Sequence, residues 1–110
     1  MNILEHYVPD PPVYASDSFT MKPEEHEVIF ASTAGGAKNV TLPPYALARE
    51  SYLRTKVPYF IRLVTGGNDL NILDGDSGSE LTALGDLDAT GDRIAIIPMC
   101  GAWFFVAHIA

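Results

Sequence analysis

The chain alternates short apolar runs with turn-forming residues, and the regular spacing of these turns restricts the possible folds more than any other feature of the sequence. Gly, Pro, Asn and Asp interrupt the apolar runs about every ten residues, a spacing typical of short strands joined by turns. The alternation of strands and helices that builds parallel sheets is not visible in the sequence. The sequence therefore predicts an all-β protein, as an antiparallel β-sandwich or barrel that is jelly-roll-like.

The pattern also predicts where the individual elements lie. Residues 45–54 are the predicted helix, because Pro44 suits a helix start. Gly66, Gly67 and Asn68 predict a tight turn that pairs residues 69–73 with the strand before it. A weaker strand is expected within 81–89. The main strands are expected at residues 27–33, 39–42, 57–64 and 69–73, with a closing hairpin formed by 93–97 and 102–109.

Residues 1–23 differ from the rest and are interpreted as an extended N-terminal arm, followed by a β domain at 24–110. Four prolines punctuate the arm, and proline suits neither a helix interior nor a central strand. The arm nevertheless carries apolar and aromatic side chains, in which disordered tails are poor. Two alternatives stay open: the arm lies on a partner, or it folds back onto its own domain. The predicted partner-binding residues are Tyr7, Val8, Val13, Tyr14 and Phe19.

Length and charge narrow the classes of partner. With 110 residues the chain fits one domain, and no apolar run approaches the roughly 20 residues of a membrane helix. The net charge of −7 argues against binding nucleic acid by general attraction. Cys100 is the one cysteine, which excludes an intrachain disulfide and suits a reducing cytoplasm.

The charges are unevenly placed along the sequence. Residues 1–27 hold six acids and one base, residues 38–62 hold five bases and one acid, and residues 69–92 hold seven acids and no base. These segments form either ordinary solvated faces or complementary faces that dock against neighbouring copies or a partner.

Patterns that carry catalysis or bind metal are weak. There is no G-x-S-x-G nucleophile motif. Cys100 is interpreted as a small apolar residue at a strand end and His108 as a histidine packed in a strand, and neither is interpreted as catalytic. The acidic run DGDSGSE at 74–80 has oxygen ligands for calcium but fails the EF-hand spacing, so it is interpreted as a solvated loop. We expect no enzymatic activity, no cofactor and no metal site.

Trp103, Phe104 and Phe105 form the densest aromatic cluster. Successive strand residues face opposite ways, so Trp103 and Phe105 share one face of the strand and Phe104 takes the other. A strand that is apolar on both faces is covered on both, by the core and by either the arm or another subunit. Trp103 and Phe105 are the predicted subunit contacts, with core packing as the alternative.

The sequence from Asn39 to Val106 resembles phage virion structural proteins, especially small head-decoration (cement) and fibre-like β domains. The residues that carry the likeness are NVTLPP at 39–44, TGGND at 65–69, DGDSG at 74–78, DATGDRIAII at 88–97 and AWFFVAH at 102–108. The segment YALARESYLRTK at 45–56 departs from the pattern as an insertion after the double proline.

This resemblance implies a capsid decoration protein that binds a phage head and contacts neighbouring major capsid subunits. Such proteins are commonly homotrimers on the virion surface, and the protein is then made and assembled in the host cytoplasm. A tail, fibre or baseplate component is the alternative that the resemblance leaves open. No nucleic-acid or membrane partner is expected.

Overall fold

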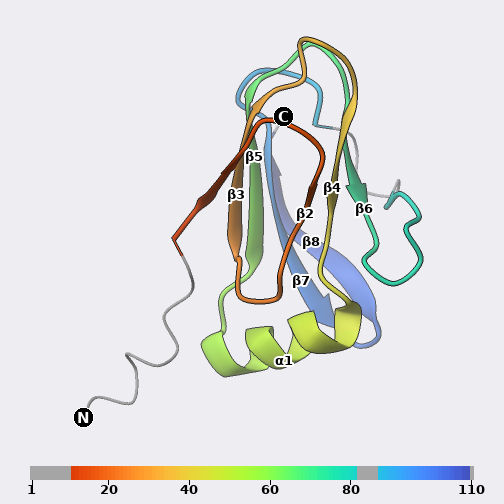
Figure 1. Ribbon diagram of the computed structural model, residues 1–110. Coiled ribbons are helices and arrows are strands. Elements are labelled where there is room, and N and C mark those ends of the chain that lie inside the picture. The colour runs from red at the N-terminus through yellow and green to blue at the C-terminus, as the bar shows by residue number, and fades with distance from the viewer. Residues whose placement is uncertain (1–10, 82–86, 110) are drawn as a thin grey trace.

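The computed structural model describes residues 11–81 and 87–109, whose strands form two sheets around one core (Figure 1). The larger sheet has the order β1-β3-β5-β7-β8 and the smaller has the order β2-β4-β6. The all-β class is confirmed, with one short helix. The elements are β1 (Val13–Ala15), β2 (Phe19–Thr20), β3 (Glu27–Ser32), β4 (Lys38–Thr41), α1 (Tyr45–Thr55), β5 (Tyr59–Thr65), β6 (Leu70–Leu73), β7 (Arg93–Met99) and β8 (Ala102–Ile109).

The predicted antiparallel arrangement is wrong for most of the strand pairs. β1, β3 and β5 run parallel to one another in the larger sheet, as do β2, β4 and β6 in the smaller. Only the pairs β5 with β7 and β7 with β8 are antiparallel among the named strands. The predicted hairpin of 93–97 and 102–109 is the second of these pairs and is confirmed.

Parallel pairing without helical crossovers is possible because the chain returns through the opposite sheet. Parallel neighbours need a long connection, which in α/β proteins is usually a helix. Here β2 lies between β1 and β3 in sequence, and β4 with α1 lies between β3 and β5. Strands β1 to β7 therefore alternate between the two sheets, and successive strand pairs stack in parallel (Figure 1).

The predicted turn at residues 66–68 is a crossing between sheets, and the expected pairing of 69–73 with the preceding strand is wrong. β6 pairs with β4 of the smaller sheet instead. The Asn68 side-chain amide donates to the Thr33 carbonyl oxygen (2.7 Å), and Gly67 N donates to Asp88 O (2.9 Å). These bonds hold the crossing against two other loops, so the segment does not close a hairpin.

Within the weaker strand expected at 81–89, residues 82–86 lie outside the described part of the chain. The described residues next to them form isolated antiparallel bridges, Leu70 with Leu87 and Leu73 with Glu80.

The core lies between the two sheets and consists of their inward-facing side chains. Alternation along β5 buries Tyr59, Ile61 and Leu63 and exposes Phe60, Arg62 and Val64, as the sequence predicts. Val40 and Ile72 contribute from the smaller sheet. The remaining larger buried side chains are Met21, Val28, Phe30, Leu42, Leu70, Leu87, Ile94 and Ile96.

The predicted helix is confirmed as α1, which lies across one end of the sheets (Figure 1). It follows Pro44 and ends at Lys56, whose left-handed backbone (φ 60°) lets its N–H donate to Tyr52 O. The distant Asp76 carboxylate accepts from Tyr45 N (3.0 Å) and so caps the first turn, where the helix dipole favours a negative charge. The acidic loop and the helix are thereby fixed together.

The described part of the predicted arm, residues 11–23, folds back onto its own domain. β1 pairs with β3 and β2 pairs with β4, so this segment adds an edge strand to each sheet. Ala15 and Met21 are buried, and Lys38 forms an ion pair with Asp17 (3.1 Å). Of the two alternatives for the arm, the second holds for these residues.

Candidate functional site

The larger sheet has one face on the core and an outer face that the described residues leave open. Strand alternation assigns the outward positions, which include Ile29 on β3, Arg62 on β5 and Ile97 on β7. Apolar side chains are unusually exposed on this outer face, by 77% at Tyr14, 40% at Phe60, 47% at Phe104 and 53% at Val106. An apolar face of this kind is typical of an interaction surface.

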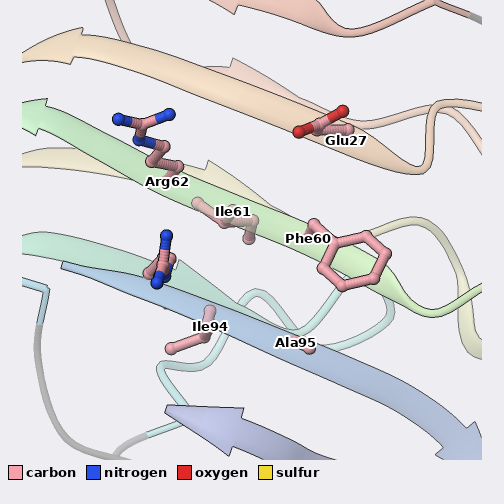
Figure 2. A pocket seen from close by; sticks show the side chains of 7 residues that line it. Glu27, Phe60, Ile61, Arg62, Ile94 and Ala95 are labelled. Carbon is pink, nitrogen blue, oxygen red and sulfur yellow. The ribbon is translucent and has the colours of Figure 1, made fainter. Parts of the chain in front are cut away.

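Two arginines lie side by side at the centre of the outer face. The register of β5 and β7 places Arg62 directly opposite Arg93, and both are exposed. Figure 2 shows Arg62 and Phe60 on β5, with Glu27 on the neighbouring β3, around a hollow of about 360 Å³ that Arg93 also lines. Among the described residues the ion pair found joins Lys38 and Asp17, so neither arginine is paired with an acid there.

A second hollow, of about 310 Å³, lies at the β1 edge of the same face. Tyr14, Ile29, Ala31 and Val64 line it together with Ala15 and Ser16. Its lining is almost wholly apolar, in contrast to the hollow between the arginines. The outer face thus combines a central positive region with apolar edges.

The predicted partner-binding residues separate into three groups. Tyr7 and Val8 lie outside the described residues. Val13 and Phe19 are half-buried and pack against the core of their own chain. Tyr14 points outward beside the second hollow and is the one of the five predicted residues that the structure places on the open face.

The predicted subunit contacts, Trp103 and Phe105, are half-buried and pack against the core. The Trp103 ring contacts Tyr45 and Tyr59 edge-on, with centroids 5.7 and 6.1 Å away. The predicted division of the strand into two faces is confirmed, because Phe104 is exposed. A role for Trp103 and Phe105 in contacts between subunits stays a prediction, whereas Phe104 is the aromatic residue of this cluster that faces solvent.

A buried histidine forms the arrangement closest to a catalytic pair. His26 Nδ1 donates to the Val57 carbonyl (2.9 Å), so in the neutral ring Nε2 accepts from the Ser51 hydroxyl (2.9 Å). His26 also stacks on Tyr59, with ring centroids 4.4 Å apart. Because His26 and Ser51 are only 2% and 3% exposed, a substrate cannot reach them. The pair instead joins α1 to the segments before β3 and β5.

Tyr59 gives this buried network a measurable pH dependence. Its hydroxyl donates to Pro23 O (2.6 Å), and burial raises the pKa of Tyr59 from 10.0 to about 12. The neutral phenol is therefore favoured in the folded state, and its contribution is complete below pH 10.0 and lost as the pH rises toward about 12. We expect the free energy of unfolding to fall by about 2 kcal/mol over this range through Tyr59 alone.

Urea unfolding followed from pH 8 to pH 12 measures this loss. Tyr59→Phe should be less stable than the wild type at pH 8 by about 1 kcal/mol, since Pro23 O loses its donor, yet it should lack the additional alkaline loss. Tyr14→Phe, at an exposed tyrosine, is the matched control and should retain the loss. Equal alkaline slopes for the wild type and Tyr59→Phe would contradict the assignment.

The acidic loop at 74–80 uses its carboxylates for local structure. Asp74 Oδ1 accepts from Asp76 N (2.9 Å), and Asp76 Oδ2 accepts from Tyr45 N. Among the described residues no three His, Cys, Asp or Glu side chains are grouped so that they could hold a metal ion. No helix in the described ranges has the length and apolarity needed to cross a membrane.

Sequence reasoning missed the arginine pair. Arg62 and Arg93 lie 31 positions apart, and only the register between β5 and β7 brings them together. The outward position of Arg62 followed from strand alternation, but its partner required knowledge of which strands are neighbours. Comparisons of the chain with family models, with curated proteins and with solved structures returned no match.

Proposed function

We propose that this chain is a capsid decoration protein that binds a phage head and stabilises contacts between neighbouring capsid subunits. The observation that carries the proposal is the open outer face of the five-stranded sheet, with its exposed apolar side chains. Exposure of an apolar sheet face to water is unfavourable in free energy, and an assembly partner that covers the face removes this exposure. The resemblance of residues 39–106 to head-decoration proteins agrees with this role.

The proposal divides the outer face between two kinds of neighbour. Tyr14 on β1 and Phe104 and Val106 on β8 lie on strands at opposite edges of the sheet. These edges contact the major capsid protein, while the centre contacts another copy of this chain, in a homotrimer. The finer fold assignment of the proposal is a small sandwich of two sheets.

A tail, fibre or baseplate component is the second candidate. It is favoured by the parallel stacking of successive strand pairs, β1 with β2, β3 with β4 and β5 with β6. Stacking of this kind repeats along one axis in elongated solenoid proteins.

Gold-labelled antibodies against the chain, applied to virions purified from its natural source, distinguish the candidates. The proposal predicts labels over the head, with many copies per particle by quantitative mass spectrometry. Labels confined to the tail would favour the second candidate. Virions that lack the chain altogether would contradict both.

A further inference from the structure

The arginine pair on the outer face of the larger sheet has no acid that balances both of its charges. Arg62 on β5 and Arg93 on β7 occupy directly opposite positions of an antiparallel pair, where like charges are destabilising. Glu27 lines the same hollow, but neither arginine forms an ion pair with it or with another acid of the described ranges. The hollow therefore has two positive charges and one negative charge, and an anion that enters it is attracted.

This hollow offers side chains and no free backbone groups to an occupant. β5 is paired on both sides, with β3 and with β7, and β7 is paired with β5 and with β8. A further strand therefore cannot be added at this point of the sheet. Each guanidinium group instead presents a planar fork of N–H donors, which matches a carboxylate.

A pair of exposed acids lies where the chain crosses from β5 to β6, at the end of the molecule opposite α1 (Figure 1). The isolated antiparallel bridge between Leu70 and Leu87 brings the residue before the first, Asp69, beside the residue after the second, Asp88. Both leucines are buried, whereas both aspartates are exposed. Within residues 11–81 and 87–109, neither aspartate forms an ion pair with a base.

Hydrogen bonds of the backbone hold this acidic pair, Asp69 and Asp88, in place. Leu70 N donates to Leu87 O (2.8 Å), and Gly67 N donates to Asp88 O. The buried Asp92 carboxylate accepts from Asp88 N (3.1 Å). Because these bonds leave the two exposed carboxylates available, a partner can bind them with little ordering of the loops.

The arginine pair and the acidic pair match in charge, spacing and exposure. Opposite positions of antiparallel segments have Cβ atoms about 4.5–5.5 Å apart, so two carboxylates of one copy can each meet one guanidinium group of another. Each pair repels itself in a free copy, and a contact between the pairs relieves both repulsions with charge-assisted hydrogen bonds. A nucleic-acid backbone is a poorer occupant, because the whole chain has a net charge of −7.

We propose that the acidic pair of one copy, Asp69 and Asp88, binds the arginine pair, Arg62 and Arg93, of a second copy. Because every copy carries both pairs, each copy can repeat the contact, and three copies can close into a ring. The inference deepens the proposed function, on which its biological setting rests. It names the residues through which copies of the chain meet at the centre of the outer face.

Sedimentation velocity of the full chain over a range of concentrations tests this contact. The wild type should self-associate, and Arg62→Glu with Arg93→Glu should weaken the association by about tenfold or more, because acids then face acids. Asp69→Lys with Asp88→Lys should weaken it by a similar factor. The chain that combines all four substitutions should recover the association, since the two pairs are then complementary again.

The matched control is Arg49→Glu with Arg54→Glu, at two exposed positions of α1. It changes the net charge by the same amount as the reversal of the arginine pair and should have little effect on the association. Circular dichroism confirms that each variant is folded. Replacement of the arginine pair by Gln and of the acidic pair by Asn is the milder test if a charge reversal disturbs the fold.

Three results would overturn the inference. The first is a wild type that stays a single chain at every concentration. The second is self-association that the reversal of either pair leaves unchanged, since loss through the arginine pair alone would mean that another group occupies the hollow. The third is a combined variant that does not recover.

These outcomes are independent of the virion experiment. Self-association with the predicted charge dependence in a chain that is absent from virions would leave this inference standing and overturn the decoration role. A chain found on phage heads whose association is insensitive to both pairs would do the reverse.

Discussion

Gly75→Ala is expected to lower the free energy of unfolding by about 3 kcal/mol or more, because the added methyl group has no space. A Cβ at position 75 would overlap the carbonyl oxygens of Leu42 and Pro43, which are backbone atoms and cannot rotate away. The acidic loop crosses the segment between β4 and α1 at this point. Relief of the overlap requires a shift of the loop, which would pull Asp76 from Tyr45 N and uncap α1.

Urea unfolding at neutral pH measures the effect, with Gly35→Ala as the matched control. A Cβ at position 35 meets no atom within 4 Å, and its φ is not in the left-handed region, so this variant should be as stable as the wild type. A loss of about 3 kcal/mol is a large share of the 5–15 kcal/mol typical of a domain. Equal stability of the two variants would show that the loop does not pack on this segment.

Phe104→Asp and Phe105→Asp are expected to have opposite consequences, although they make the same change at adjacent positions. Phe105 packs against the core, so a carboxylate there loses apolar contacts and becomes poorly solvated. We expect Phe105→Asp to lose about 3–5 kcal/mol of stability. Phe104 faces solvent on the other side of β8, and its replacement should cost less than about 1 kcal/mol.

Phe104→Asp, the variant expected to keep its stability, is the one expected to lose binding. The proposed decoration role predicts that Phe104→Asp folds normally yet reduces the number of copies in purified virions by about tenfold or more, since it places a charge at an apolar edge of the proposed interaction surface. Thermal unfolding and quantitative mass spectrometry of virions provide the two measurements. A Phe104→Asp chain that is incorporated at wild-type levels would exclude the β8 edge from the contact.

Local features of the fold could be predicted from the sequence because they depend on neighbouring residues. Alternation along 57–64 gave the buried and exposed faces of β5, and Pro44 gave the start of α1. The closing hairpin followed from the turn residues at 98–101, where Cys100 and Gly101 have positive φ. Each of these features is decided within about ten residues of sequence.

The strand order could not be predicted in the same way. The lack of a visible alternation of strands and helices argues against a parallel sheet, but here the opposite sheet provides the return path between parallel strands. The residues at 66–68 are of the types that favour hairpin turns, yet their hydrogen-bond partners, Thr33 and Asp88, are distant in sequence. Interactions of this range leave no local pattern.

The candidate site illustrates the same division. Tyr14 was expected to bind a partner and lies on the open face, whereas Val13 and Phe19, expected in the same role, pack inward. The sequence of an arm does not distinguish an apolar residue that faces a partner from one that packs on its own core, because the difference depends on the strand pairing. The position of Arg93 beside a second arginine could not be predicted, because it depends on Arg62, which lies opposite it on the neighbouring strand.

The central claim is that the outer face of the five-stranded sheet is covered in the assembled protein. Hydroxyl-radical labelling tests it most directly, by comparing Tyr14, Phe60 and Phe104 in purified virions with the same residues in the dilute free chain. We predict that all three are strongly labelled in the free chain and protected in virions, while the buried Tyr59 is labelled weakly in both. Equal labelling of the three outward residues in the two states would contradict the claim.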